Sequence, residues 1–298
     1  WTKNINLLFY KFITTKINYL KLLKLKKMAN VKKESTSNGG GMVSGLIIAA
    51  CIGVGVLIWK FIMGSPSNFE GGNPEGVPLN TLGQVYHGGV VVPVLLGMLL
   101  MVIVFSIERY FVISKAAGKS KLDTFMTKIQ TSVKAGEIDE AISLCDKQQG
   151  SVANAIKSAL VKYIAVKKEG FNSEEAAETI HKEIEEATSL EMPMLQKNMT
   201  IISSLVSLGT LIGLLGTVSG MIKAFGALAA AGTPDQAALA SGISEALINT
   251  ATGIGTSAVA IISYNFFTSK IDDLTYSIDE AAVSIVNTYR RFRGSLKQ

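Results

Sequence analysis

The residue with the clearest chemical potential is Glu245, a carboxylate inside the longest apolar stretch of the sequence. It belongs to the run 241–256, which continues into an apolar segment that ends near Tyr264. A charged side chain near the centre of a membrane helix costs roughly 2.5–3.5 kcal/mol on insertion scales, and such residues usually face a bundle interior or a water-filled path. We therefore interpret Glu245 as part of an ion path or of a buried protein contact.

The neighbours of Glu245 form a polar stripe along the same predicted helix. With about 3.6 residues per turn, several polar side chains fall within about half a turn of Glu245. They are Ser241, Asn249, Thr252 and Thr256. A stripe with this negative fixed charge is compatible with cations. The alternative is a neutral Glu245 that hydrogen-bonds a neighbouring helix or subunit, because a medium of low dielectric favours the uncharged carboxyl.

The preceding apolar segment, about 199–225, carries hydroxyls and glycines in register. Ser203, Thr210 and Thr217 are seven residues apart and share one helical face. Small residues four apart let membrane helices approach closely. They are Gly209, Gly213, Gly216 and Gly220. We predict that this helix and the Glu245 helix form a hydrated polar groove, although the hydroxyls could instead bond to their own helix carbonyls.

Lys223 lies near the far end of the same apolar segment. Long basic side chains near helix ends extend their charged heads to the membrane interface. We expect Lys223 to do this rather than pair with a carboxylate.

Bulk composition places the chain among integral membrane proteins. Charged residues are 17% of the 298 residues, against about 25% in soluble domains, and the mean hydropathy is +0.34. The net charge of +6 comes from Lys and Arg that cluster beside apolar runs, as the positive-inside rule describes. Without a recognition motif, this charge does not indicate nucleic-acid binding.

The sequence lacks the usual signatures of an enzyme or a metal protein. Its two cysteines, Cys51 and Cys145, are not part of a CxxC or Cys/His ligand pattern. We also find no nucleophile–base set or metal-ligand cluster in the sequence. We therefore expect no enzymatic activity, no cofactor and no metal site.

The apolar segments predict an all-α, polytopic membrane protein with four transmembrane helices. An extra helix over 42–63, a second over 90–113 and a pair within 198–268 are each long enough to cross about 30 Å of hydrocarbon. We favour an uncleaved helix over a signal peptide for 42–63, because its apolar part is long and no clear cleavage site follows. The pair in 198–268 is expected to form the pore.

The polar segments set the predicted topology. The loop 64–89 contains two glutamates and no Lys or Arg, which favours the periplasmic side. A helical cytoplasmic domain is expected over 114–197, between the second and third spans, because apolar residues there recur at helical spacing. The C-terminal helix 269–298 is rich in basic residues near its end. Both termini are therefore predicted to be cytoplasmic.

Two local features carry separate expectations. Residues 1–41 form a basic N-terminal segment. One interpretation is that 1–27 are translated upstream sequence with Met28 as the start, and another is an amphipathic segment on the membrane surface. Pro193 is expected to kink or break the helix that leads into the third span.

Two stretches of the sequence closely resemble the MotA/TolQ/ExbB proton-channel family, and its ExbB/TolQ branch in particular. They are Gly-Leu-Leu-Gly-Thr-Val-Ser-Gly-Met-Ile-Lys-Ala-Phe over 213–225 and Gly-Ile-Ser-Glu-Ala-Leu-Ile-Asn-Thr-Ala-Thr-Gly-Ile over 242–254, followed by Tyr-Asn at 264–265. The resemblance runs from about residue 88 to 290 and includes Glu-Arg-Tyr at 108–110 at the end of a span.

The resemblance implies a bacterial inner-membrane homopentamer around two single-span partner subunits of the ExbD/TolR type. In this family an aspartate on the partner carries the proton. Thr217 and Thr250 occupy the positions of the pore threonines, and Glu245 occupies that of the membrane glutamate. Thr210, Asn249 and Thr252 complete the expected pore lining. Proton flow is implied to rotate the partner and to pass force to a TonB-like protein.

Departures from the family pattern leave alternatives open. Val259 stands where the family often has a proline. With the extra helix at 42–63 the chain has four spans and an insert after the second, an arrangement that resembles the MotA plan. The alternatives are a TolQ-like subunit, a flagellar or gliding motor stator, and a non-conducting membrane scaffold. Helical periodicity adds that Thr250 lies roughly 140° from Glu245 around the helix, so the two side chains need not face the same space.

Overall fold

The computed structural model describes residues 39–169, 171–230 and 236–295. The predicted N-terminal segment up to residue 38 and positions 231–235 of the short connection between the third and fourth spans lie outside the described residues. The chain divides into two units, 1–49 and 50–298. All the contacts below lie within the second unit.

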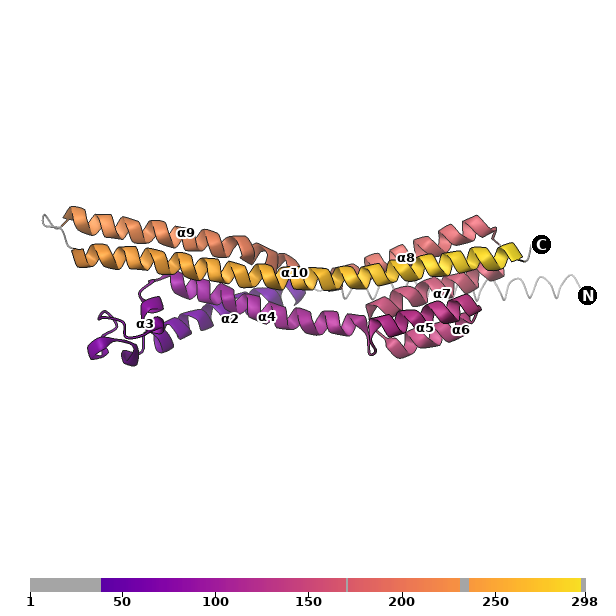
Figure 1. Ribbon diagram of the computed structural model, residues 1–298, viewed down its shortest axis with the longest axis horizontal. Helices are drawn as coiled ribbons and strands as arrows, with labels where there is room; N and C mark the ends of the chain where they lie inside the picture. The colour runs from indigo at the N-terminus through magenta and orange to yellow at the C-terminus, as the bar shows by residue number, and fades with distance from the viewer. Residues whose placement is uncertain (1–38, 170, 231–235, 296–298) are drawn as a thin grey trace, which may run out of the picture. The chain divides into compact units, whose positions relative to one another are not determined.

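The described residues are almost entirely helical (Figure 1). The long helices are α2 (Gly39–Leu57), which continues as the π-helical turn η1 (Ile58–Met63), α4 (Val91–Ala117), α9 (Met199–Ala230) and α10 (Gln236–Ser295). The shorter ones are η2 (Pro66–Asn68), η3 (Glu70–Gly72), α3 (Thr81–Tyr86), α5 (Leu122–Ala135), α6 (Ile138–Gln148), α7 (Ser151–Glu169) and α8 (Ser173–Gln196). Within the described ranges, four helices are long and apolar enough to cross a membrane. The prediction of an all-α polytopic membrane protein is confirmed.

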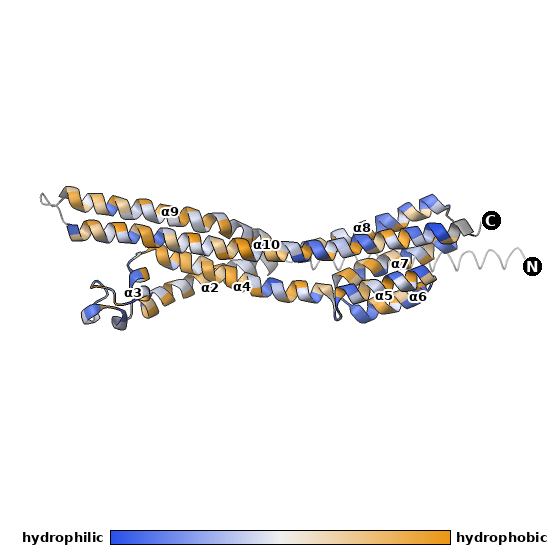
Figure 2. Ribbon diagram, viewed as in Figure 1, coloured by the Kyte–Doolittle hydropathy of each residue, from blue (hydrophilic) through white to orange (hydrophobic). Residues whose placement is uncertain are grey.

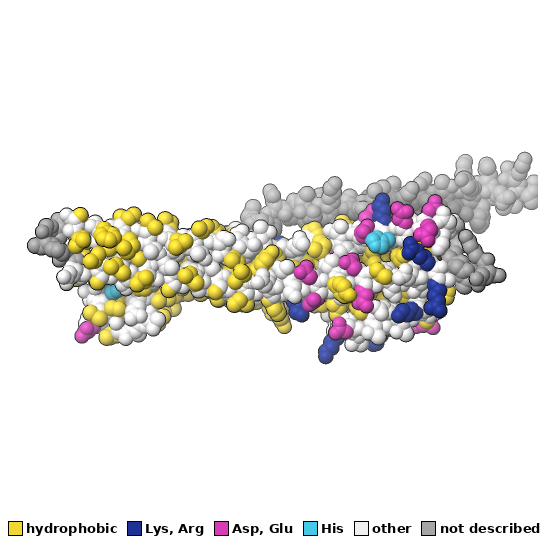
Figure 3. Space-filling model, turned by 45° about the horizontal axis from the view of Figure 1, so that its top comes forward, with side chains coloured by type: hydrophobic (Ala, Val, Ile, Leu, Met, Phe, Trp, Pro, Cys, Tyr) yellow, Lys and Arg dark blue, Asp and Glu magenta, His cyan; other side chains and the backbone are white. Residues whose placement is uncertain are grey.

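Hydropathy divides the second unit into an apolar and a hydrophilic part. Figure 2 shows apolar residues along α9, α4 and the adjoining half of α10, and hydrophilic residues on α5–α8 and on the rest of α10. Acidic and basic side chains on the face drawn in Figure 3 gather over this second region. Because α10 runs unbroken through both parts, one helix connects the apolar span to the hydrophilic helices.

Glycines hold α9 and α10 close together. A Cβ atom on Gly220 would lie 2.7 Å from the carbonyl oxygen of Gly242, and one on Gly253 would lie 2.6 Å from the carbonyl oxygen of Gly209. These distances are shorter than any real carbon contact, so the two backbones approach closely only because the side chains are absent.

The second half of α2 packs against α4 in the same way. A Cβ atom on Gly55 would lie 2.6 Å from the carbonyl oxygen of Pro93, and one on Gly97 would lie 2.8 Å from the Cα atom of Ile52. Small residues on both helices therefore create the contact between the additional helix and the rest of the bundle.

The segment 64–89 is folded onto the end of η1. The Trp59 ring stacks on Tyr86 with centroids 4.7 Å apart, and its Nε1 donates a hydrogen bond to the Tyr86 carbonyl oxygen at 3.2 Å. Phe69 is buried against the same tyrosine. The Asn68 amide donates to the carbonyl oxygens of Ile62 and Met63, which are the last residues of η1 and would otherwise be unpaired.

The hydrophilic helices enclose their own apolar core. Ile156 and Leu160 of α7, Ile180 of α8 and Ile285 of α10 are all fully buried. Cys145 of α6 belongs to this core, and burial together with the neighbouring Asp146 raises the pKa of its thiol to about 12. The thiol is therefore protonated at neutral pH and is a packing group rather than a nucleophile.

The break before α9 differs in position from the expectation. Helix α8 continues through Pro193 to Gln196, and the chain turns at Asn198, whose φ of 62° is left-handed. The break therefore lies after the proline. A proline on an exposed position of the last helical turn removes one hydrogen bond near the helix end, so the helix continues past it. Val259, which stands where the family often has a proline, lies inside the continuous α10.

Arg109, near the end of α4 that adjoins the hydrophilic helices, fixes the geometry of this break. Its side chain is 1% exposed. Its Nη1 donates hydrogen bonds to the carbonyl oxygens of Met194 at 3.0 Å and Leu195 at 3.2 Å. Glu108 accepts from Arg109 and from the Asn198 amide at 3.1 Å. The guanidinium thus satisfies carbonyls that the end of α8 leaves unpaired.

We expect replacement of a glycine at the α9–α10 contact to destabilise the protein. Gly220→Ala places a Cβ against backbone atoms and should cost about 1–3 kcal/mol, as overpacking does. Gly226 lies in the same helix with no heavy atom within 4 Å of a Cβ position, so Gly226→Ala should be neutral or stabilising by about 0.5–1 kcal/mol. Thermal unfolding in detergent measures both, and equal shifts would refute the close approach.

We also expect Arg109→Met to destabilise the junction between α4 and α8. The buried carbonyls left unpaired should cost about 1–3 kcal/mol. Arg290→Met is the matched control, because Arg290 pairs with Glu174 at the surface, where both side chains are at least 49% exposed, and surface pairs contribute about 0–1 kcal/mol. If the two variants unfold at the same temperature, Arg109 does not hold the junction.

Candidate functional site

Glu245 forms an ion pair with Lys223 across the α9–α10 contact. The Lys223 Nζ lies 2.6 Å from the Glu245 Oε1. The glutamate side chain is 13% exposed and the lysine side chain 54%. The expectation that Lys223 extends to the interface without a carboxylate partner is therefore wrong. The two residues are 22 apart in sequence, and the hairpin of α9 and α10 brings them face to face, which lowers the cost of both charges in an apolar span.

Glu245 also rests against the turn that precedes α4. Gly89 has a φ of +71°, and a Cβ atom there would lie 2.7 Å from the Glu245 Oε1. A residue with a side chain would be strained in this conformation and would collide with the carboxylate. Gly89 therefore both makes the turn and leaves room for Glu245.

Asn249 lies one turn further along α10 and is fully buried, with 0% exposure. A Cβ atom on Gly216 would lie 2.5 Å from the Asn249 Cβ, and one on Gly88 would lie 3.2 Å from its Oδ1. The Asn249 side chain thus occupies the space between α9 and the turn before α4.

Thr217 of α9 and Thr250 of α10 meet through their hydroxyls. Each also lies near a carbonyl oxygen one turn earlier in its own helix, at 3.3 Å for Gly213 and 3.3 Å for Ala246. A hydroxyl can donate one hydrogen bond and accept others. The pair is therefore a place where a proton can be donated and accepted between the helices.

The other predicted hydroxyls divide into two groups. Thr210 donates to the Ser257 hydroxyl at 2.9 Å and so joins α9 to α10. Thr252 donates to the carbonyl oxygen of Ile248 at 2.8 Å. Thr256 likewise donates to the carbonyl oxygen of Thr252. The last two hydroxyls bond within their own helix, which is the common role of threonine in membrane helices.

The structure thus brings most of the predicted residues to one seam between α9 and α10. Glu245, Asn249, Thr250 and Thr217 follow one another along the seam, with Thr210 further towards the hydrophilic helices. The four predicted packing glycines all meet α10: Gly209 at Ser257, Gly213 at Asn249 and Gly253, Gly216 at Asn249, and Gly220 at Gly242. We call the side chains of Glu245, Asn249, Thr250, Thr217 and Thr210 the polar seam.

Sequence reasoning missed three contributors to the polar seam. Lys223 is the ion-pair partner of Glu245, Ser257 is the partner of Thr210, and the Gly88–Gly89 turn receives Glu245 and Asn249. Two adjacent glycines directly before an apolar span were a usable signal that another helix approaches the backbone there. Helical periodicity alone does not show which residues on different helices form a pair.

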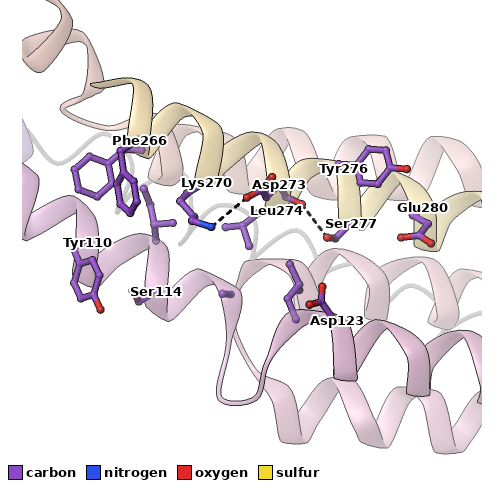
Figure 4. Close-up of a pocket in the computed structure, with 14 residues that line it drawn as sticks. Tyr110, Ser114, Asp123, Phe266, Lys270, Asp273, Leu274, Tyr276, Ser277 and Glu280 are labelled. Atoms are coloured by element: carbon purple, nitrogen blue, oxygen red, sulfur yellow. Dashed lines mark hydrogen bonds and ion pairs between the residues drawn. The ribbon is translucent and has the colours of Figure 1, made fainter. Parts of the chain in front are cut away.

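A separate groove of about 630 Å³ lies where α4 and α10 leave the apolar part (Figure 4). The aromatic side chains of Tyr110 and Phe266 line it together with Lys270 and Asp273, which form an ion pair at 3.4 Å. Aromatic and charged residues at this level are typical of a membrane–water interface. The groove contains none of the polar seam residues.

The ion pair predicts a measurable coupling between its two residues. Lys223→Met and Glu245→Gln should each destabilise the protein, and the double variant should lose less than the sum by about 0.5–3 kcal/mol, because neither charge is then left alone in the span. The matched control is the exposed pair of Lys270 and Asp273, whose coupling should be at most about 0.5 kcal/mol. Additive effects at Lys223 and Glu245 would show that the pair does not form.

Comparison with known proteins identifies relatives of the chain. Residues 147–280 match the model of the MotA/TolQ/ExbB proton channel family. A putative biopolymer transport protein, ExbB-like 3, from Synechocystis sp. is 27% identical over 69% of this chain and 93% of its own length. The Tol-Pal system protein TolQ of Pseudomonas aeruginosa is 24% identical over 53% of this chain and 69% of its own length.

A third relative is similar over a shorter segment. The biopolymer transport protein ExbB of Xanthomonas campestris is 33% identical over 32% of this chain and 38% of its own length. The family match includes α9 and most of the polar seam. These similarities, together with the membrane helices and the residues of the seam, support the MotA/TolQ/ExbB proton channel family, in its ExbB-like branch, as the family of the chain.

Proposed function

We propose that the chain is the ExbB-like subunit of an inner-membrane proton channel that drives TonB-dependent transport across the outer membrane. The observation that carries this proposal is the hydroxyl contact of Thr217 and Thr250, which lies along the same helix pair as the Lys223–Glu245 ion pair. A membrane protein keeps such polar groups within an apolar span at a free-energy cost, and they usually mark an ion or proton pathway.

In this proposal the threonine hydroxyls exchange hydrogen bonds with an acidic residue of a single-span ExbD/TolR-like partner. A shallow hollow of about 580 Å³ on the outer face of α9 supports the idea of a helical partner. Thr217 lies beside Val218, Met221, Ile222 and Phe225 in this hollow. An apolar partner helix with one acidic side chain would cover the apolar residues and present its carboxyl to Thr217.

Glu245 has a supporting role in this mechanism. Its ion pair with Lys223 and its position against Gly89 hold the carboxylate inside the protomer. We infer that Glu245 sets the electrostatic potential and hydration near the threonines, whereas the partner's acidic residue carries the proton. About 2.3 kcal/mol per charge per 100 mV is available from the membrane potential for the resulting movement.

The assembly proposed is a homopentamer around the partner, in the bacterial inner membrane, with both termini in the cytoplasm and with a TonB-like protein as the recipient of force. The presence of many Lys and Arg on the hydrophilic helices and their absence from the loop 64–89 support this orientation. The ExbB names of two relatives support the TonB output. We also propose that the chain has no enzymatic activity of its own.

A second candidate is a TolQ-like subunit, which the TolQ relative of Pseudomonas aeruginosa favours. A motor stator is a further alternative, because four candidate spans with a helical insert after the second resemble the MotA plan. The partner distinguishes them: a single-span partner with a small periplasmic domain supports ExbB or TolQ, and a peptidoglycan-binding domain supports a stator.

Proton flux into liposomes tests the proposed function. The complex of the chain with its co-purified partner should conduct protons under a membrane potential. Thr217→Val and Glu245→Gln should lower the flux by about 10²-fold, the size of effect typical for groups that assist proton transfer. Leu215→Val, at an exposed apolar position of α9 outside this hollow, is the matched control.

Two outcomes contradict this account. If the wild-type complex conducts no more than empty liposomes, the chain is a scaffold rather than a channel subunit. If Thr217→Val and Glu245→Gln conduct like the wild type, the polar seam is not the proton path.

A further inference from the structure

Asn249 has an unusual environment for an amide. Its side chain is 0% exposed, and neither Oδ1 nor Nδ2 has a hydrogen-bond partner among the residues that the structure describes. A buried polar group without a partner costs about 1–3 kcal/mol. Nearly all such groups in folded proteins are therefore paired with protein or with an ordered water.

The location of Asn249 limits what this partner is. The carboxamide lies inside the protomer, between Gly216 of α9 and Gly88 of the turn before α4. Because the side chain has no exposed surface, a side chain of another subunit does not reach it. A water molecule is small enough, and it offers both the donor that Oδ1 needs and the acceptor that Nδ2 needs.

The same location places the Asn249 side chain beside Glu245. Glu245 is one helical turn before it, and residues four apart on a helix are neighbours on the surface. The Asn249 Oδ1 lies against Gly88 and the Glu245 Oε1 against Gly89, so both polar groups face the same turn. Of the polar seam residues, Asn249 is the one whose side chain has no protein partner among the described residues.

We propose that a water molecule hydrogen-bonds both the Asn249 carboxamide and the Glu245 carboxylate. Asn249 is then a positioning residue for this water. The inference rests on the proposed function, since it specifies how the seam is hydrated. The water hydrates the Glu245 carboxylate, and the amide neither gains nor loses a proton.

Two substitutions separate positioning of water from simple packing. Asn249→Leu has nearly the same shape but offers no hydrogen bond, so it should lower proton flux about tenfold, the factor that corresponds to losing one hydrogen bond in the path. Asn249→Ser keeps a hydroxyl and leaves room for water, so it should restore most of the flux. Ser244→Ala, on the exposed side of the same turn, is the control and should leave flux unchanged.

A packing role predicts the opposite order. Leu would fill the site and Ser would leave a cavity, so Asn249→Ser would then be the more damaging variant in both thermal stability and flux. Flux of Asn249→Leu equal to that of the wild type, or lower flux in Asn249→Ser than in Asn249→Leu, overturns the proposal.

Electron cryomicroscopy of the complete complex, at a resolution that shows ordered water, decides the matter without a flux measurement. Density within hydrogen-bonding distance of both the Asn249 amide and the Glu245 carboxylate supports the water site, even if the wild-type complex does not conduct and the proposed function fails. A well-ordered Asn249 without such density overturns the water site and leaves the proposed function standing.

Discussion

The close contact between α9 and α10 is the constraint on which the rest of the structure depends. A Cβ atom on Gly209, Gly216 or Gly220 of α9 would lie 2.5–2.7 Å from atoms of α10, and one on Gly213 would lie 3.1 Å away. In a membrane, where lipid is as apolar as leucine, such close packing replaces the hydrophobic effect as the force that joins helices. It also decides which polar side chains can reach one another.

The polar seam follows from this contact. With the backbones close together, short side chains are long enough to bridge the helices, as Thr217 and Thr250 do, and as Thr210 and Ser257 do. Wider spacing would leave each hydroxyl to its own helix carbonyl, as at Thr252. The same proximity allows Lys223 to reach Glu245, so the carboxylate of the seam is also held in place.

Much of this architecture could be predicted from the sequence because it is periodic. The glycine spacing indicated a helix–helix contact. The polar stripe around Glu245 indicated which part of α10 carries the polar side chains of the contact. Partners on other helices could not be predicted in this way, because periodicity gives the face of a residue but not its neighbour. Lys223 is an example, since its long side chain is compatible with both an interface position and an ion pair. The turn at Gly88 and Gly89, and the continuation of α8 past Pro193, depend on tertiary packing that sequence patterns do not contain.

The central claim is that the seam between α9 and α10 is hydrated in the assembled channel, and cysteine accessibility measures this most directly. The native Cys51 and Cys145 are both buried and would be replaced by alanine. In membranes that contain the partner, Thr217→Cys and Thr250→Cys should react with a small water-soluble thiol reagent, whereas Leu247→Cys, on the exposed apolar face of α10, should not. Equal protection of all three cysteines would contradict a hydrated seam and with it the account of proton conduction given above.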